Sequence, residues 1–145
     1  MTLLAPPLAA YIGRPPAPDF RGKTLAGESF SRDELKDKPV LIQFWATWCG
    51  YCRRDEPAVE RIVSEQPNLV VLAVNVNESK QKIRSYLERS PRTPKIVATE
   101  DTNLPAVFEV KAFPTYVLID KKGGIVDRQD GAGGYAALEQ LLSKL

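Results

Sequence analysis

The sequence predicts an α/β fold in which a central mixed β-sheet is covered by helices. Apolar runs typical of buried strands alternate along the chain with segments of helical periodicity. The predicted element order, β-α-β-α-(β)-α-β-β-α, favours parallel strands first and an antiparallel hairpin at the end. With 145 residues, 43% of them hydrophobic and 26% charged, the chain has the length and composition of one globular domain with its own core.

The first part of the chain is predicted to be an extension without regular structure. Five of the twelve prolines fall within the first 19 residues, and this density favours an extended backbone. The apolar stretch between Thr2 and Ile12 has no cation before Arg14, so it lacks the pattern of a signal peptide. We expect an N-terminal extension over residues 1–14 and one domain over residues 15–145. Either the protein is cytosolic, or an export signal was removed before this chain was made.

Short elements are predicted at the start of the domain. Thr24–Phe30 has Gly27 at its middle, which is typical of a short hairpin. Ser31 and Glu34 have the spacing of a capping box, in which the serine caps a helix and the glutamate three residues later completes the cap. We therefore expect a short helix that begins after Ser31 and extends through Lys36.

Two buried strands and two amphipathic helices follow. Val40–Ala46 and Leu69–Val76 are apolar runs with few polar atoms, as expected for strands covered on both faces. Gly50–Glu65 and Ser79–Arg89 place their apolar residues at helical spacing. The alternation of these segments predicts parallel strands joined by crossover helices.

Five further segments complete the predicted domain. They are a short strand, a short helix, the two strands of a hairpin and a C-terminal helix, in the order Ile96–Ala98, Asn103–Val110, Thr115–Asp120, Ile125–Gln129 and Tyr135–Leu145. The hairpin is expected to give the sheet its antiparallel part.

The composition excludes several kinds of functional site. The chain has no histidine, which removes histidine-based triads, histidine general bases and histidine metal ligands. Its two cysteines are too few for a structural zinc site, which needs four ligands, and too few for a disulfide scaffold. The net charge of +2 gives no electrostatic reason to expect nucleic acid or an anionic membrane as a partner. No apolar run has the length of a membrane span.

The two cysteines mark the candidate site. Cys49 and Cys52 are separated by two residues, at the point where the strand that ends near Ala46 is followed by the helix that begins near Gly50. A C-x-x-C motif in an α/β context is typical of thiol–disulfide exchange. An inert buried pair would not need this corner between a strand and a helix.

The start of the helix is predicted to activate Cys49. At the N-cap position its sulfur lies near unpaired backbone N–H groups, and we expect the amides of Tyr51 and Cys52 to donate to it. The helix dipole and the cations of Arg53 and Arg54 act in the same direction and lower the pKa of the thiol. Because the thiolate is the reactive species, Cys49 is the predicted nucleophile, and Cys52 is its more buried partner.

Four stretches of the chain carry a family resemblance. They are Ile12-Gly13-Arg14 with Ala17-Pro18-Asp19-Phe20, Phe44-Trp45-Ala46-Thr47-Trp48-Cys49, Asn75-Val76-Asn77-Glu78-Ser79 and Phe113-Pro114-Thr115. Together they resemble the TlpA/ResA-like thiol–disulfide oxidoreductases, over nearly the whole chain. The resemblance implies a thioredoxin-like fold with an extra βα insertion after the active-site helix.

The resemblance also implies a reaction. Cys49 attacks a substrate disulfide, or a substrate thiol attacks in the opposite direction, and Cys52 resolves the mixed disulfide. No bound cofactor or metal is required. The implied partners are a protein disulfide or dithiol and a separate thiol donor, with no nucleic acid and with any membrane tether confined to a removed N-terminal segment. The implied setting is bacterial and extracytoplasmic, for a monomer whose role is often reducing, as in keeping the haem-binding cysteines of cytochrome c reduced.

Two positions depart from related patterns and leave the proton acceptor open. Gly50-Tyr51 replaces a dipeptide that often has proline beside the second cysteine, and Gln43 replaces a buried aspartate of thioredoxin. Glu78 is our candidate, because it follows the second buried strand at the same sheet edge as Cys49. Shielding there is expected to raise the pKa of Glu78 and let it exchange a proton with Cys52. The alternative is an acid in the first turn of the next helix, favoured by the dipole.

The substrate-binding surface is predicted around the same corner. The resemblance implies a cis peptide bond before Pro114, which leaves the backbone of Phe113 free to pair with an extended substrate segment. Trp48 is expected to form an exposed apolar platform, with Gly50 and Tyr51 beside the reactive sulfur. The alternative for Pro114 is an ordinary proline at the start of a strand.

Three other functions are weighed against this one. A cytosolic thioredoxin is disfavoured by the insertion around Glu78. A thiol peroxidase of a related fold has threonine three residues before its reactive cysteine, whereas this chain has Ala46 there and places Thr47 one residue too close. A binding module would use the groove beside Phe113 and Pro114, with the cysteines vestigial. Reduction of insulin with a thiol donor separates such a module from an enzyme.

Overall fold

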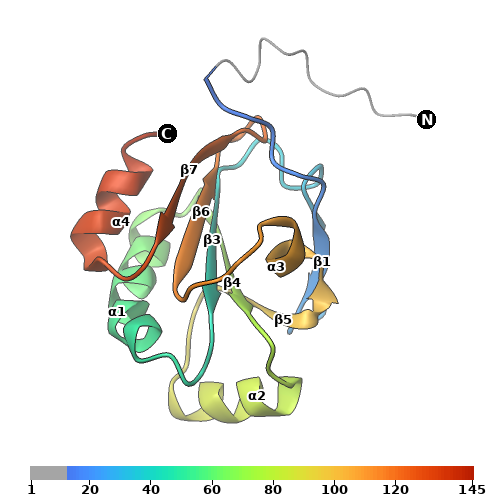
Figure 1. Cartoon of the computed structure of the whole chain (residues 1–145), viewed down its shortest axis with the longest axis vertical. Helices are drawn as coiled ribbons and strands as arrows, with labels where there is room; N and C mark the ends of the chain where they lie inside the picture. The colour runs from blue at the N-terminus through green and yellow to red at the C-terminus, as the bar shows by residue number, and fades with distance from the viewer. Residues whose placement is uncertain (1–12) are drawn as a thin grey trace.

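A seven-stranded β-sheet forms the centre of the molecule, with helices packed on it (Figure 1). This computed structural model describes residues 13–145, so the extension predicted for residues 1–14 lies outside the described residues except for its last two positions. The strands are β1 (Arg21–Thr24), β2 (Ser29–Ser31), β3 (Val40–Trp45), β4 (Val70–Asn75), β5 (Lys95–Thr102), β6 (Thr115–Ile119) and β7 (Ile125–Asp130). The helices are α1 (Gly50–Glu65), α2 (Lys80–Arg89), α3 (Leu104–Val107) and α4 (Gly134–Leu142).

The sheet is mixed, as the sequence predicts, with strand order β2-β1-β5-β4-β3-β6-β7. β3 pairs in parallel with β4, and β4 pairs in parallel with β5. β6 and β7 are antiparallel to their neighbours, so the predicted antiparallel end of the sheet is confirmed. All six residues of β3 are buried, because this central strand is covered on both faces.

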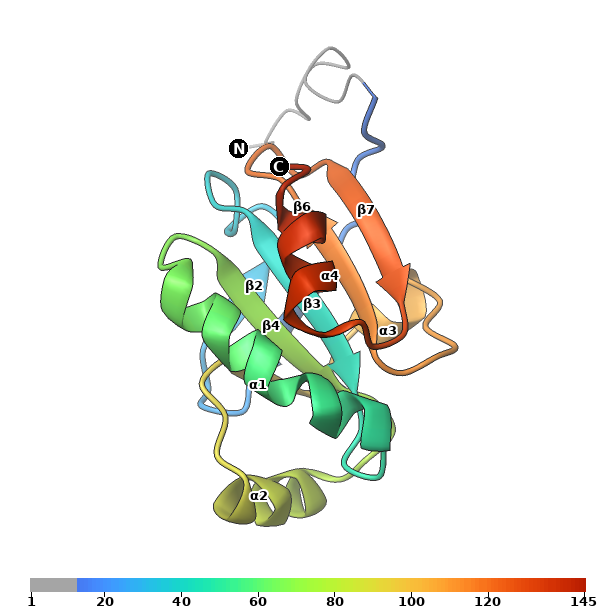
Figure 2. The same ribbon diagram turned by 90° about the vertical axis from the view of Figure 1, so that its left-hand side faces the viewer.

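Helices cover both faces of the sheet. α1 and α4 lie side by side over one face (Figure 2), whereas α3 lies over the opposite face and α2 lies at one end (Figure 1). Successive residues of β3 point to opposite faces. Leu41 packs with Ile62 of α1 and Leu138 of α4, and Phe44 packs with Leu104 of α3. The alternation therefore places apolar cores on both faces, and Trp45, on the same side of β3 as Leu41, belongs to a third buried cluster that contains Cys49 and Cys52.

The register of the central strands brings three segment ends together. Trp45, the last residue of β3, pairs with Asn75, the last residue of β4. Phe44 of β3 pairs with Thr115, the first residue of β6. Residues 46–52, which follow β3, residues 76–79, which follow β4, and the loop before β6 therefore meet at one end of the sheet.

The short helix predicted after Ser31 is wrong, although its capping contacts are present. The Ser31 hydroxyl accepts a hydrogen bond from the Glu34 amide and donates one to the Glu34 carboxylate, both at 3.2 Å. One helical bond follows, from the Leu35 amide to the Ser31 carbonyl at 3.1 Å. Asp37 then adopts a φ of 77°, outside the right-handed helical region, and the segment remains a series of turns.

Other elements differ from the prediction in length only. The hairpin predicted for Thr24–Phe30 is formed by β1 and β2. β5 extends beyond the predicted strand Ile96–Ala98, because β1, which lies between β2 and β5 in the sheet, pairs with it as far as Thr102. α3 ends early, at Val107, because Glu109 has a φ of 49° and cannot continue the helix.

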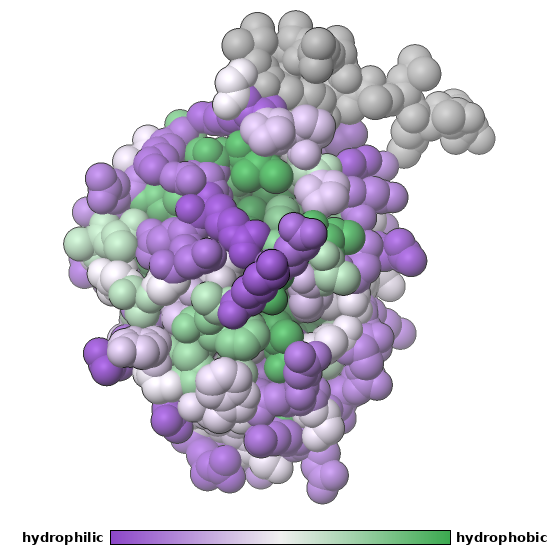
Figure 3. All heavy atoms as spheres, in the orientation of Figure 1, coloured by the Kyte–Doolittle hydropathy of each residue, from purple (hydrophilic) through white to green (hydrophobic). Residues whose placement is uncertain are grey.

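Polar side chains cover most of the outer surface. On the face shown in Figure 3, a band of polar side chains crosses the middle, with smaller apolar areas above and below it. Three large hydrophobic side chains stand out as exposed among residues 13–145: Trp48, Tyr51 and Leu145. Over the same residues, every helix is too short or too polar to cross a bilayer.

Candidate active site

The two cysteines form a disulfide at the start of α1. Their Cα atoms are 5.2 Å apart, within the usual range for a disulfide. Cys49 is the N-cap residue, with extended backbone angles, and its sulfur accepts a hydrogen bond from the Cys52 amide at 3.1 Å. Cys52 is the more buried of the two, as predicted, with 1% of its surface exposed against 4% for Cys49. The predicted corner between strand and helix is therefore present.

One predicted contact at this corner is wrong. We expected the Tyr51 amide to donate to the Cys49 sulfur as well, but within residues 13–145 that sulfur accepts from the Cys52 amide alone. An N-cap side chain reaches the second or the third amide of the helix, and the bond to Cys52 selects the third. The Tyr51 ring is 59% exposed and lies 4.7 Å from the guanidinium of Arg54.

An aromatic surface surrounds the disulfide. Trp48 is 63% exposed, and its ring meets the edge of Phe113 at a centroid distance of 5.7 Å. Phe113 packs against the buried cluster that contains both cysteines. The peptide bond between Phe113 and Pro114 is cis, and Pro114 is buried. The Phe113 backbone makes no hydrogen bond to any other residue between 13 and 145, so its polar groups are available to a bound chain.

Glu78 lies close to this corner, in the loop between β4 and α2. Its side chain is only 4% exposed. One carboxylate oxygen accepts from the Thr47 amide at 2.6 Å and from the Asn75 side chain at 2.8 Å. The other accepts from the Thr47 hydroxyl at 2.5 Å and lies 3.3 Å from the Lys82 ammonium. Glu78 therefore fixes the loop that precedes Cys49 to the end of β4.

The expected rise in the pKa of Glu78 is wrong. Burial does oppose the charged carboxylate, but the hydrogen bonds from Thr47, Asn75 and Lys82 outweigh it and lower the pKa of Glu78. Nor does the carboxyl belong to the first turn of α2, because Ser79 caps that helix and Glu78 precedes the cap. In the disulfide form Glu78 is an ionised hydrogen-bond acceptor.

We predict that replacing Glu78 by glutamine destabilises the protein in a pH-dependent way. A glutamine keeps one acceptor oxygen but turns an NH2 group toward buried donors, which should cost about 1–3 kcal/mol in the free energy of unfolding at pH 7. Because the folded-state pKa of Glu78 lies below its unfolded value, the carboxylate's contribution is complete above about pH 5 and is lost as the pH falls below about 4.

Urea denaturation of the disulfide form at a series of pH values measures this difference. Glu88→Gln, which makes the same change at an exposed glutamate of α2, is the matched control and should have little effect. A constant difference between wild type and Glu78→Gln down to pH 3 would contradict the role of the ionised carboxylate.

A buried polar network connects β3, β6 and α1. Of its members, the sequence singles out only Gln43. Gln43 donates to the Tyr116 hydroxyl at 3.1 Å and accepts from Arg92 at 2.9 Å. Tyr116 in turn donates to the Asp55 carboxylate at 2.7 Å. The Arg92 guanidinium lies 5.2 Å from the centre of the Trp45 ring. Nothing local in the sequence marks Asp55, Tyr116 or Arg92, since each gains its role only from partners far along the chain.

Comparison with known proteins adds an independent line of evidence. The model of the AhpC/TSA family matches residues 14–128. The chain is 37% identical over 130 residues to the thioredoxin-like protein YneN of Bacillus subtilis, covering 87% of this chain and 76% of that protein. It is 29% identical over 128 residues to the thiol-disulfide oxidoreductase ResA of Halalkalibacterium halodurans, covering 87% and 73%.

A solved structure shows the same fold. The pneumococcal exposed lipoprotein thioredoxin Etrx1 of Streptococcus pneumoniae superposes with a TM-score of 0.76 at 25% sequence identity. The match covers 88% of this chain and 100% of that one.

Proposed function

Because the chain belongs to the AhpC/TSA family and is a thiol–disulfide oxidoreductase, we propose that it reduces protein disulfides outside the cytoplasm. The observation that carries the proposal is the Cys49–Cys52 disulfide at the N-terminus of α1, with exposed aromatic side chains beside it. This arrangement offers a sulfur that can exchange and a surface on which a polypeptide can bind.

The proposed reaction begins from the reduced dithiol. The Cys49 thiolate attacks one sulfur of the substrate disulfide, the substrate S–S bond breaks, and its other sulfur leaves as a thiolate that takes up a proton. The Cys52 thiolate then attacks the Cys49 sulfur, forms the Cys49–Cys52 disulfide and releases the second substrate thiol. Two electrons and two protons pass from the dithiol to the substrate, and a separate thiol donor restores the dithiol.

The position of each sulfur supports these roles. The Cys49 sulfur occupies the N-cap and accepts the Cys52 amide, a contact that favours a negatively charged sulfur. Cys52 lies inside the helix and is almost completely buried, as a resolving cysteine can be. We propose that Cys49 is the nucleophile and Cys52 the resolving residue.

The surface around the disulfide supports binding of an extended polypeptide. Trp48 and Tyr51 provide exposed aromatic area, and among residues 13–145 a Cβ at Gly50 would meet no atom within 4 Å apart from its chain neighbours and the backbone of its own helix. The backbone of Phe113 can pair with a substrate segment by strand addition, with buried Pro114 holding the loop in place. We propose that these residues bind the substrate chain on both sides of its cysteine.

Glu78 is proposed to assist the exchange. Its carboxylate positions Thr47, two residues before Cys49, and is ionised, so it is in the form that can accept a proton from Cys52. The pH–rate profile of Glu78→Gln separates the two contributions. A shifted profile supports proton transfer, whereas an unchanged profile with a lower rate assigns Glu78 to positioning alone.

The cellular setting and the partners are part of the proposal. Similarity to an exposed lipoprotein thioredoxin supports an extracytoplasmic location. The family resemblance supports a monomer that receives electrons from a separate thiol donor, with the haem-binding cysteines of cytochrome c as one candidate substrate. Its reducing role predicts a reduction potential of about −270 mV, the value of thioredoxin. A potential of about −120 mV, the value of the oxidant DsbA, would contradict that role.

We expect the protein to accelerate the reduction of insulin by a small dithiol. Light scattering from the precipitating B chain measures the rate, and the donor without protein gives the background. Cys49→Ala removes the attacking sulfur and should return the rate to that background. If wild type and Cys49→Ala accelerate the reaction equally, the disulfide is not the reacting group.

A further inference from the structure

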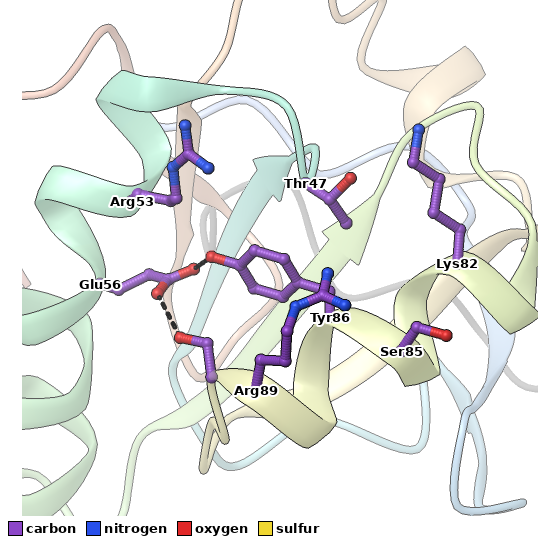
Figure 4. Close-up of a pocket in the computed structure, with 8 residues that line it drawn as sticks. Thr47, Arg53, Glu56, Lys82, Ser85, Tyr86 and Arg89 are labelled. Atoms are coloured by element: carbon purple, nitrogen blue, oxygen red, sulfur yellow. Dashed lines mark hydrogen bonds between the residues drawn. The ribbon is translucent and has the colours of Figure 1, made fainter.

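An open pocket of about 510 Å³ lies next to the segment that carries Cys49 and Cys52 (Figure 4). It is lined by residues of α1, of α2 and of the loops next to them: Thr47, Arg53, Glu56, Lys82, Ser85, Tyr86, Arg89 and Ser90. Thr47 precedes Cys49 by two residues, and Arg53 directly follows Cys52. The pocket is therefore within reach of the residues that flank a cysteine bound at the disulfide.

Three cations surround this pocket. Figure 4 shows Arg53 of α1 and Lys82 of α2 on opposite sides, with Arg89 between them. Lys82 lies 3.3 Å from Glu78, whereas Arg53 and Arg89 form no ion pair with any residue between 13 and 145. Both arginines are exposed. Their guanidinium groups are therefore free to bind a carboxylate of a ligand.

The one acid in the lining is already occupied. Glu56 accepts from the Tyr86 hydroxyl at 2.6 Å through one oxygen and from the Ser90 hydroxyl at 3.4 Å through the other. These bonds hold Glu56 against the C-terminal end of α2 (Figure 4). Because Lys82 is paired with Glu78 and Glu56 accepts from Tyr86 and Ser90, the positive charge that the lining offers to a ligand comes mainly from Arg53 and Arg89.

Resting on the proposed reduction of protein disulfides, we infer that this pocket binds aspartate or glutamate side chains next to the reacting cysteine of the substrate. Arginine forks match carboxylates in geometry as well as in charge. A substrate chain held by Trp48 and Phe113 on one side of Cys49 places its neighbouring residues toward Arg53 on the other. The aromatic side of the corner then binds any sequence, and the pocket selects acidic ones.

Two cyclic peptides closed by a single disulfide test this selectivity. They have the same length and differ only in glutamate or glutamine on either side of the cysteines. The readout is the ratio of kcat/KM for the acidic and the neutral peptide with the pre-reduced protein, because this ratio cancels any change in the redox chemistry itself. Since electrostatic attraction raises association rates by factors of 10 or more, we expect a ratio of about 10 at low ionic strength, falling toward 1 in about 0.5 M salt.

Substitutions in the pocket should lower this ratio. Arg89→Gln and Arg53→Gln are each expected to reduce it about threefold, and Arg89→Glu to bring it below 1. Arg84→Gln makes the same charge change on α2 but outside this pocket, in the lining of another one, and should leave the ratio unchanged.

The outcomes separate the pocket from the reaction. A wild-type ratio of 1, or a ratio that Arg53→Gln and Arg89→Gln do not change, refutes the inference while leaving the reductase activity intact. If oxidised glutathione shows the arginine dependence and the peptides do not, the pocket binds a small anionic thiol and the inference is wrong. A wild-type protein that reduces neither peptide refutes the proposed function itself.

Discussion

Replacing Cys52 by serine is expected to turn the protein into a trap for its substrates. The Cys49 sulfur can still attack, but the group that breaks the mixed disulfide is missing, so covalent adducts with substrate should accumulate. Turnover in disulfide reduction should fall by at least about 10³-fold, as for other removals of a covalent catalyst. Mass spectrometry of adducts formed with a disulfide peptide measures the trapping, and the insulin assay measures the loss of turnover.

Cys49→Ser is the matched variant, because it makes the same atom change at the other end of the same disulfide. It should lose turnover to the same extent and trap nothing. The reason is that Cys52 is 1% exposed and lies inside α1, where a substrate sulfur cannot approach it in line. Equal trapping by the two variants would show that our assignment of nucleophile and resolving cysteine is wrong.

Local patterns in the sequence predict the parts of this site that depend on neighbouring residues. The predicted helix Gly50–Glu65 has the bounds of α1, because its apolar spacing lies within the segment and its capping residue, Cys49, directly precedes it. The buried run Val40–Ala46 predicts the central strand β3, since only a strand covered on both faces carries so few polar atoms. These two elements alone place Cys49 and Cys52 at a corner.

What the sequence could not predict depends on partners far along the chain. Burial alone would raise the pKa of Glu78, but hydrogen bonds outweigh it and lower the pKa, and the strongest of them come from Thr47, which is 31 residues away. The capping box at Ser31 forms its bonds without a helix, because Asp37 has a φ of 77° and its amide donates to the distant Lys121 carbonyl at 2.8 Å. In both cases the local contacts form as the residue types predict, and residues distant in the sequence change their consequence.

Removing the buried carboxylate of Asp55 is expected to be the most destabilising of the proposed changes. One Asp55 oxygen accepts the Tyr116 hydroxyl of β6 at 2.7 Å, and the other accepts the Gly134 amide at the start of α4 at 3.0 Å. Asp55 thus connects α1 to β6 of the sheet and to the start of α4. Asp55→Ala leaves the buried Tyr116 hydroxyl and the half-buried Gly134 amide without their acceptor, and we expect a loss of about 3–5 kcal/mol in the free energy of unfolding.

Smaller changes in the same network should cost less. Asp55→Asn keeps one acceptor oxygen, and Tyr116→Phe removes a single hydroxyl while preserving the ring, so each should cost about 1–3 kcal/mol. Asp19→Ala, which removes an exposed aspartate outside any strand or helix, is the control and should stay within about 0.5 kcal/mol of wild type. Urea denaturation of the disulfide forms at pH 7 gives all these values on one scale.

The double variant Asp55→Ala with Tyr116→Phe decides whether the two groups act together. Once the carboxylate is gone, the Tyr116 hydroxyl has lost its acceptor, so deleting it as well should cost less than deleting it from wild type. We expect the double variant to be more stable than the sum of the single effects predicts, by about 1 kcal/mol or more. Strict additivity would mean that the hydroxyl and the carboxylate are stabilised independently. In that case the buried polar network is a set of separate contacts, and α1 is held to the sheet by its apolar face alone.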